Sequence, residues 1–282
     1  MNISIKYHIP AREMDFVNIN LSKDNKIFLD PLRIRMGKTE IHKLCNKKIE
    51  YFISNLLELS KKRKYDKLIE IIENLYERNE TRLGYSLQTA YGKSFGENGG
   101  KNLVKLLANN DFVSSGKIED IFDCLMMIPN IGEDKVSDLI TTIIFLDLIK
   151  YTQNQCDLWK IEMNKISLDK LCWEDNLKQW VKIDTELPIY NNKAIVFVPK
   201  SFVGEKYLFS YEKLYRDVII PLYKQREFDT IGSKFVIKYK NGKKHVLGNE
   251  LRKEYPCTKY IVMDFIKKYY NVYRDYKSNF IT

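Results

Sequence analysis

This 282-residue sequence lacks several features, and each absence excludes a class of protein. It has no apolar run long enough to cross a bilayer, so we expect no membrane partner, and no secretory signal is visible. Its five cysteines are scattered and form no CxxC pair, which argues against a zinc ribbon or a disulfide framework. Its three histidines are too isolated for a His-based metal site or a Ser-His-Asp triad. We therefore expect a cytoplasmic protein with free thiols.

Positive charge is in excess and is unevenly distributed. Residues 183–282 hold 19 Lys and Arg against 11 acidic residues, whereas residues 1–182 hold 28 against 26. The same last hundred residues contain 12 of the 19 tyrosines. Lysine interleaved with aromatic residues can neutralise phosphates and stack bases. The alternative is a solvated lysine-rich face over a tyrosine-rich core; of the two, the composition favours a nucleic-acid partner.

Hydrophobic periodicity predicts the order of the secondary structure. Alternating apolar and polar residues over 3–35 predict a short β section. Helical spacing after an N-cap at Thr39 predicts a first helix, and we expect others at 66–78, 117–127 and from 133 to about 151. Residues 152–182 carry all three tryptophans and are interpreted as further packing helices.

The C-terminal part of the sequence has the pattern of β-hairpins followed by a helix. Hairpins are predicted around Asn191-Asn192 and, more clearly, around Asn241-Gly242, and a terminal helix is expected over 258–276. The predicted fold class is therefore α+β, with a short N-terminal β section, a central helical body and a basic C-terminal region containing a hairpin. We expect domains at 1–182 and 183–282, or one integrated domain.

A glycine-rich stretch runs from Gly84 to Gly100 and leads into a predicted helix. Such a loop can bind anions through its backbone N–H groups. Neither Gly92-Lys93-Ser94 nor Gly100-Lys101 has the first glycine that a P-loop requires, so we predict no ATP binding. The stretch is either a plain surface loop or a loop that closes over a phosphodiester, with Arg82 and Lys93 as phosphate contacts.

Residues 128–140 resemble a helix-hairpin-helix, with Asn130 in place of the first glycine of the motif. Asparagine tolerates a left-handed backbone, so the turn is expected to form. The resemblance implies that Lys135 holds a DNA phosphate, but Glu133 and Asp134 place negative charge on the same approach. A purely structural helix–turn–helix and a metal site remain as alternatives.

The metal hypothesis rests on three carboxylates. Asp134 and Asp138 are four residues apart and share one helical face, and Glu80 precedes the glycine-rich stretch. Carboxylate oxygens suit Mg²⁺, which could activate water for phosphodiester hydrolysis, with Lys135 or Arg82 stabilising the phosphate. The predicted catalytic set is thus Glu80, Asp134, Asp138 and Lys135. The E-x-K and D-x-K triplets at 133–135 and 24–26 are too short to identify a PD-(D/E)xK nuclease.

Five groups of residues, taken in order, resemble an uncharacterised bacterial protein family associated with restriction and phage-defence gene clusters. They span about 28–200 and are Phe28-Leu29-Asp30-Pro31, Asn79-Glu80 with Leu83-Gly84-Tyr85-Ser86, Ile131-Gly132 with Asp134 and Ser137-Asp138, Tyr151-Thr152 with Gln155-Cys156, and Val198-Pro199-Lys200. The resemblance implies a defence context and a nucleic-acid partner.

The leading hypothesis is an antiviral or restriction-type defence protein that acts on nucleic acid as a Mg²⁺-dependent nuclease. DNA is favoured over RNA as its nucleic acid. The alternatives are a non-catalytic DNA- or RNA-binding subunit and a scaffold that binds a neighbour-encoded defence protein. In a binding module, the nucleic acid would be held by the hairpin lysines, namely Lys238, Lys240, Lys243 and Lys244.

Overall fold

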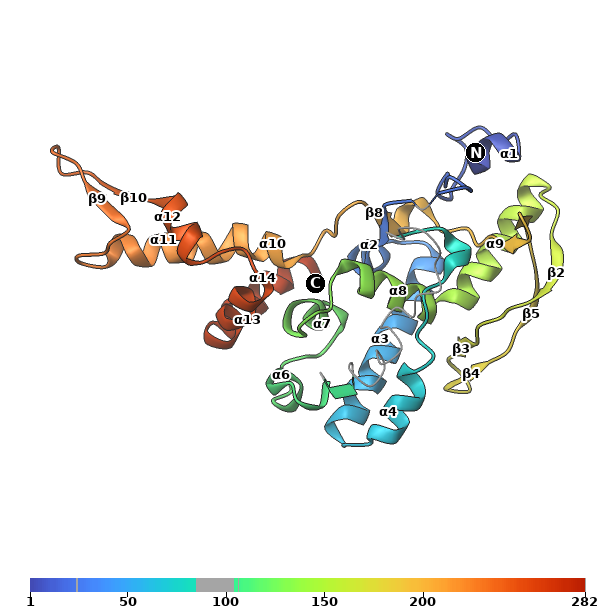
Figure 1. Ribbon diagram of the computed structural model, residues 1–282, viewed down its shortest axis with the longest axis horizontal. Helices are drawn as coiled ribbons and strands as arrows, with labels where there is room; N and C mark the ends of the chain where they lie inside the picture. The colour runs from blue at the N-terminus through green and yellow to red at the C-terminus, as the bar shows by residue number, and fades with distance from the viewer. Residues whose placement is uncertain (24, 85–103, 106, 282) are drawn as a thin grey trace. The chain divides into compact units, whose positions relative to one another are not determined.

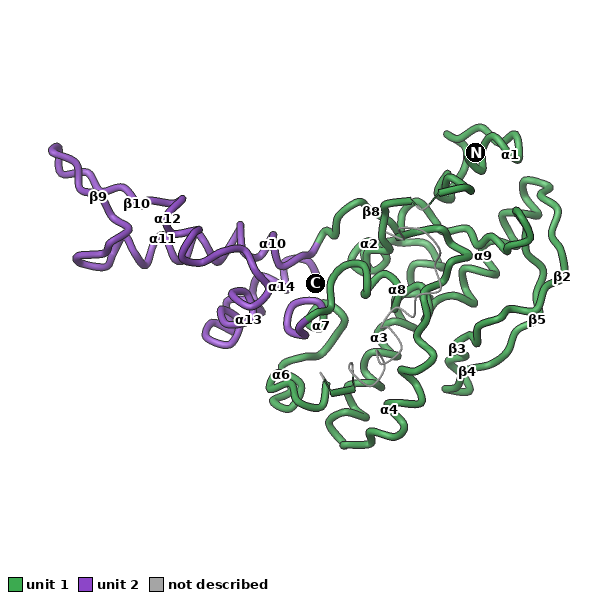
Figure 2. Tube along the Cα trace, in the orientation of Figure 1, with its two compact units in different colours: residues 1–124, 130–208 green, residues 125–129, 209–282 purple. Residues whose placement is uncertain are grey.

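The computed structural model describes residues 1–23, 25–84, 104–105 and 107–281. The chain divides into two compact units (Figure 2). Unit 1 contains residues 1–124 and 130–208, and unit 2 contains residues 125–129 and 209–282. The basic section that starts at residue 183 therefore contributes to both units. Small antiparallel sheets, central helices and a C-terminal hairpin with terminal helices confirm the predicted α+β class (Figure 1).

The first half of unit 1 is mainly helical. Its elements are α1 Ile3–Lys6, β1 Phe28–Leu29, α2 Pro31–Met36, α3 Glu40–Lys61, α4 Tyr65–Ile72, the 3₁₀ turn η1 Asn79–Thr81 and α6 Asp111–Ser114, followed by α7 Ile121–Met127, which runs from unit 1 into unit 2. Thr39 does precede the long helix α3, as predicted, and its hydroxyl lies 2.6 Å from Nδ1 of His42. The second predicted helix is shorter than expected, because α4 ends at Ile72.

The second half of unit 1 begins with two helices and continues as short strands. The elements are α8 Glu133–Ile143, α9 Phe145–Trp159, β2 Asn164–Ser167, β3 Cys172–Glu174, β4 Gln179–Val181, β5 Asp184–Leu187, β6 Ile189–Tyr190, β7 Lys193–Ala194, the 3₁₀ turn η2 Lys200–Phe202 and β8 Val203–Gly204. Strand β2 pairs with β5, β3 with β4, β6 with β7, and β8 returns to pair with β1.

Three local predictions in unit 1 are wrong. Residues 3–6 form a helical turn, in which Ile3 is buried and Ile5 is 62% exposed. The helix expected to reach residue 151 is interrupted at Ile144. Residues 152–182 are not all helical, because Lys160 adopts a left-handed backbone (φ 56°) and ends α9. Trp173 and Trp180 are seven residues apart, as in a helical repeat, yet they face each other across β3 and β4 with ring centroids 5.4 Å apart.

Two interactions show how unit 1 is held together. The rings of Phe16 and Phe197 stack at 4.2 Å, joining the N-terminal segment to the chain after β7. On α3, the Lys48 amine lies 2.8 Å from Asp147 of α9 and 3.4 Å from Asp175, which follows β3. An ion pair of this kind is strong in a partly buried site, because little water screens it.

Unit 2 consists of α10 Tyr211–Leu214, the π turn η3 Tyr215–Ile219, α11 Ile220–Asp229, β9 Val236–Lys238, β10 Lys244–Val246, α12 Gly248–Glu254, α13 Lys259–Lys268 and α14 Tyr270–Ile281. The π turn ends two residues before Pro221, which cannot donate a backbone hydrogen bond. The Asn241-Gly242 hairpin forms as predicted, with Gly242 at φ 81°. The terminal helix is broken into two at Tyr269.

In the part of the chain that the structure describes, no helix is both long and apolar enough to cross a membrane.

Candidate functional site

Two places in the molecule hold the predicted site residues, one in each unit. The first lies in unit 1, where α8 begins next to residues 78–84. Gly132 precedes α8, and Asp134 lies in its first turn. A Cβ atom placed on Gly84 would lie 3.8 Å from Oδ1 of Asp134, so the start of α8 faces this segment. Desolvation raises the pKa of the Asp134 carboxyl, and the positive charge of Lys135 partly opposes that shift.

Lys135 stabilises the turn that precedes α8. Its amine donates a hydrogen bond of 2.9 Å to the backbone carbonyl of Asn130. Asn130 has a φ of 60°, the left-handed conformation that the sequence predicts for this position. The turn of the helix-hairpin-helix resemblance is therefore present, and the lysine predicted to hold a phosphate forms a bond within it.

The three predicted metal ligands do not form a cluster. Among the described residues, no group of three or more His, Cys, Asp or Glu side chains is placed to hold a metal ion. Glu80 lies in η1, where its charge acts on the neighbouring cations Arg78 and Lys170. Asp138 on α8 also acts on Lys170. The carboxylates of this region are thus distributed around basic groups.

Arg78 is the central buried cation of this region and is 2% exposed. Its Nη2 donates to the carbonyl of Leu171, and its guanidinium lies 4.3 Å from the ring centroid of Phe145. Within the described part of the chain, its Nε and Nη1 have no hydrogen-bond partner, and neither does Oε2 of Glu80. Burial lowers the pKa of Arg78, and the nearby Cys172 and Glu80 oppose that shift.

The groups around Arg78 are held mainly by backbone contacts. The Lys170 amine donates to the carbonyl of Glu77 at 2.6 Å; burial lowers its pKa, against the attraction of Glu80. Cys172 is fully buried, and burial raises the pKa of its thiol, against the effect of Arg78. A protonated, inaccessible thiol is a poor nucleophile. This cluster therefore has the features of an internal charge network rather than those of a reactive centre.

Arg82 ends the same segment in a left-handed conformation, with φ 57°. Its backbone carbonyl accepts hydrogen bonds from the backbone N–H of Asn25 at 3.0 Å and from Nδ2 of Asn25 at 2.9 Å. These bonds attach the segment to the N-terminal part of the unit. The glycine-rich stretch follows directly, and its predicted phosphate contact, Lys93, lies outside the described residues.

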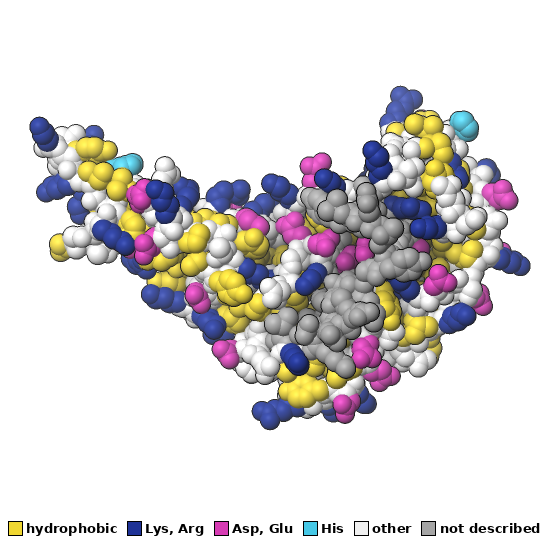
Figure 3. Space-filling view, in the orientation of Figure 1, with side chains coloured by type: hydrophobic (Ala, Val, Ile, Leu, Met, Phe, Trp, Pro, Cys, Tyr) yellow, Lys and Arg dark blue, Asp and Glu magenta, His cyan; other side chains and the backbone are white. Residues whose placement is uncertain are grey.

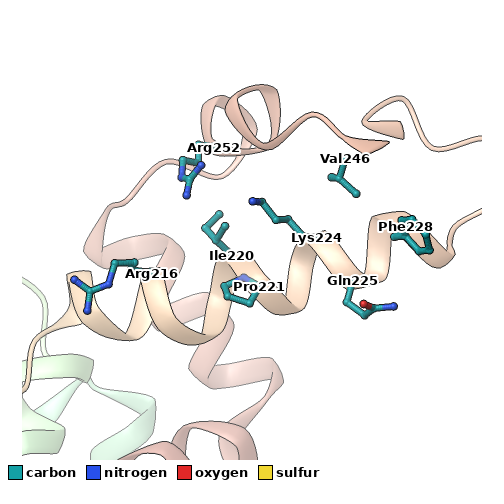
Figure 4. A pocket seen from close by; sticks show the side chains of 8 residues that line it. All are labelled: Arg216, Ile220, Pro221, Lys224, Gln225, Phe228, Val246 and Arg252. Atoms are coloured by element: carbon teal, nitrogen blue, oxygen red, sulfur yellow. The ribbon is translucent and has the colours of Figure 1, made fainter. Parts of the chain in front are cut away.

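The second place is a cavity of about 410 Å³ in unit 2 (Figure 4). Helix α11 and the turn before it form one wall, while β10 and α12 form the other. The eight described residues of the lining include three cations and no Asp or Glu; they are Arg216, Ile220, Pro221, Lys224, Gln225, Phe228, Val246 and Arg252. The lining thus combines apolar side chains with three positively charged ones.

Lys224 and Arg252 come together at this cavity because Gly248 has no side chain. A Cβ atom on Gly248 would lie 3.1 Å from Nζ of Lys224 and 3.7 Å from Nη1 of Arg252. In Figure 4 both side chains point into the space between α11 and α12. Neither forms an ion pair with any described residue, whereas Arg216 at the end of the cavity is paired with Asp217 at 2.6 Å. Two cations that form no ion pair with a described residue are suited to an anion such as a phosphate.

The four predicted hairpin lysines all lie at β9, β10 or the turn between them, and all are exposed. Lys238 and Lys244 are direct cross-strand partners. The Lys244 amine lies 5.4 Å from the ring centroid of Phe228, which lines the cavity. The hairpin lysines therefore extend the positively charged surface from the cavity to the end of the hairpin.

The sequence analysis missed Lys224 and Arg252. A signal was available, because Arg216, Ile220, Lys224 and Phe228 recur every fourth residue and so share one helical face. The position of Arg252 opposite that face depends on the turn at Leu247 and Gly248, which no local pattern predicts.

Comparison with curated proteins and with solved structures gives no match. A protein-family model does match, over residues 6–210, which is most of the chain and covers nearly all of unit 1. This agrees with the prediction of an uncharacterised family. The chain belongs to the family described as "Domain of unknown function (DUF8370)".

Proposed function

We propose that this protein binds nucleic acid and that unit 2 contacts the phosphate backbone. The observation that carries the proposal is the convergence of Lys224 and Arg252 around Gly248, in a cavity whose described lining contains no carboxylate. Two converging cations can bind phosphate oxygens with strong charge-assisted hydrogen bonds, although Arg252 itself is exposed. The net charge of +10 and the basic C-terminal hundred residues would attract a polyanion from a distance.

The hairpin extends this surface. Between Asp229 and Glu250 the sequence contains five lysines and no acidic residue. In Figure 3, Lys and Arg side chains surround hydrophobic and histidine side chains at the hairpin end of unit 2. A cavity that takes one phosphate and a hairpin that contacts its neighbours would together explain why basic residues concentrate here.

The test is a fluorescence anisotropy titration of labelled DNA and RNA oligonucleotides at several salt concentrations. We expect Arg252→Glu to weaken binding about tenfold and to reduce the slope of log affinity against log salt by about 1. Lys253→Glu is the matched control, since it makes the same charge change at the next residue of α12, outside the cavity lining. Equal effects of the two variants, or no binding by the wild type, would contradict the proposal.

We extend the proposal to the defence context that the ordered motifs imply. DNA is the first nucleic acid to test. The proposed protein partner is a defence protein encoded by a neighbouring gene. A cytoplasmic location fits the same context. Cleavage is a separate hypothesis, and Mg²⁺ and the set Glu80, Asp134, Asp138 and Lys135 stay predictions. Mg²⁺-dependent cleavage that is lost in Asp138→Asn, while oligonucleotide binding is kept, would support it; cleavage that continues in that variant would refute this set.

A further inference from the structure

The two faces of the β9–β10 hairpin differ in what covers them. Side chains alternate between the faces of a strand, and cross-strand partners share a face. Val246 lines the cavity and Lys244 lies over Phe228, so the face that carries them is turned toward α11. Ile237 and His245 are direct partners one residue further along and therefore lie on the opposite face.

That opposite face carries aromatic and apolar side chains that are exposed. Tyr239 is 51% exposed and Ile237 is 42% exposed. The ring centroids of Tyr239 and His245 lie 6.4 Å apart, with 44° between the ring planes, as expected for diagonal neighbours on one face. Tyr239 is held at the end of the hairpin, because its N–H donates to the carbonyl of Lys243 at 2.9 Å.

Lysines lie next to these two rings in the sequence. Tyr239 lies between Lys238 and Lys240, and His245 follows Lys243 and Lys244. Exposed rings on a lysine-rich hairpin, with Lys243 on their own face, match a polyanion that also offers flat aromatic faces. A nucleic-acid strand with unpaired bases has both properties. In a duplex the flat base faces are covered by the neighbouring base pairs, so the phosphates and the base edges in the grooves are accessible but stacking on a base is not.

We propose that the outward face of the hairpin, formed by Ile237, Tyr239, Lys243 and His245, stacks unpaired bases, so that the nucleic acid this protein binds is single-stranded. This inference deepens the proposed function and depends on it. The phosphate contacts give affinity for any nucleic acid, and the rings on this face give the preference for unpaired bases.

The experiment compares one oligonucleotide sequence in single-stranded and duplex form with a polyglutamate peptide, which carries charge but no bases. We expect the wild type to prefer the single strand over both. Tyr239→Ala should weaken single-strand binding about tenfold and duplex binding less than about twofold. Tyr239→Phe, which keeps the ring, should bind as the wild type does. Tyr260→Ala is the matched control, because Tyr260 is 67% exposed in α13 of the same unit.

The possible results separate the two proposals. If the wild type binds with steep salt dependence but Tyr239→Ala changes nothing, or lowers single-strand and duplex binding equally, the stacking inference is overturned and the phosphate proposal stands. Polyglutamate binding as tight as that of the oligonucleotide also overturns the stacking inference, in favour of an acidic protein partner. If no nucleic acid binds, both proposals fail.

Discussion

Lys48 in unit 1 and Lys224 in unit 2 are both helical lysines, but their surroundings are opposite. The Lys48 side chain is 20% exposed and lies between two carboxylates, at 2.8 and 3.4 Å. Lys224 lies beside Arg252 in a cavity with no carboxylate in its described lining. A cation surrounded by acids stabilises the fold, whereas two cations without acids repel each other until an anion binds. The charge of Lys48 is therefore paired within unit 1, whereas under the proposed function the charges of Lys224 and Arg252 in unit 2 would be paired by a bound phosphate.

The comparison predicts its largest effect at Lys48. Burial alone would lower the pKa of this amine, but the hydrogen bond and charge of Asp147, together with Asp175, raise it. Lys48→Met would leave Asp147 and Asp175 close together without a cation, so we expect the free energy of unfolding to fall by about 3 kcal/mol. Chemical denaturation followed by tryptophan fluorescence measures this change, because all three tryptophans lie in unit 1.

Lys43→Met is the matched control for Lys48→Met. Lys43 lies on the same helix, and its partner Glu40 is fully solvated, so we expect no measurable change in stability. If both variants lower stability equally, the partly buried position of Lys48 has no special role.

The second prediction removes the charge of the hairpin. Replacing Lys238, Lys240, Lys243 and Lys244 with glutamine should weaken oligonucleotide binding about fiftyfold at low salt and make the salt dependence clearly shallower. Thermal unfolding should be unchanged, because these side chains are exposed. A loss of stability comparable to that of Lys48→Met would show that the hairpin charges are structural too.

Two glycine substitutions sharpen the comparison, and the one in unit 1 has the larger effect on stability. In Gly37→Ala, the new Cβ atom would lie 1.7 Å from Cδ2 of His42, a ring that is 6% exposed and packs against Phe202. The ring must move, so we expect the free energy of unfolding to fall by about 2 kcal/mol, measured by the same denaturation. An unchanged denaturation midpoint would mean that the His42 ring moves at no cost.

The smallest effect is expected for Gly248→Ala in unit 2. There the new Cβ atom would lie 3.0 Å from Cε of Lys224, the far end of a flexible side chain that can move aside. Stability should be unchanged or slightly higher, since alanine favours the helix. Oligonucleotide affinity should fall about threefold, because Lys224 and Arg252 no longer converge. A loss of stability without a loss of affinity would contradict the role given to Gly248.

The sequence predicts local structure well where one residue type decides it. The turns at Asn191-Asn192 and Asn241-Gly242 gave hairpins, because Asn191, Asn192 and Gly242 accept the left-handed backbone that tight turns need. Thr39 marked the start of α3. The helices predicted over 152–182 were wrong beyond Trp159, because Lys160 adopts a left-handed backbone and the chain after it forms paired strands, with Trp173 opposite Trp180.

The candidate sites were harder to predict than the fold. The hairpin lysines lie within seven residues of one another, so their common surface follows from the turn alone. The environment of Glu80 depends on Arg78 and on Lys170, which is ninety residues away in sequence and is brought near by β3. Contacts of that range are set by the packing of the whole unit, which sequence patterns do not encode.

The division of the chain also affects how the protein is made. Leu125, Met126 and Met127 are almost fully buried and belong to unit 2, although the rest of that unit begins at Phe209. On the ribosome, about eighty more residues are synthesised after this segment before the rest of unit 2 begins to emerge, which takes several seconds at ordinary rates of synthesis. During that gap, residues 125–129 would lack the other residues of their unit. It also means that a chain truncated near residue 210 would keep an apolar segment without the rest of its unit.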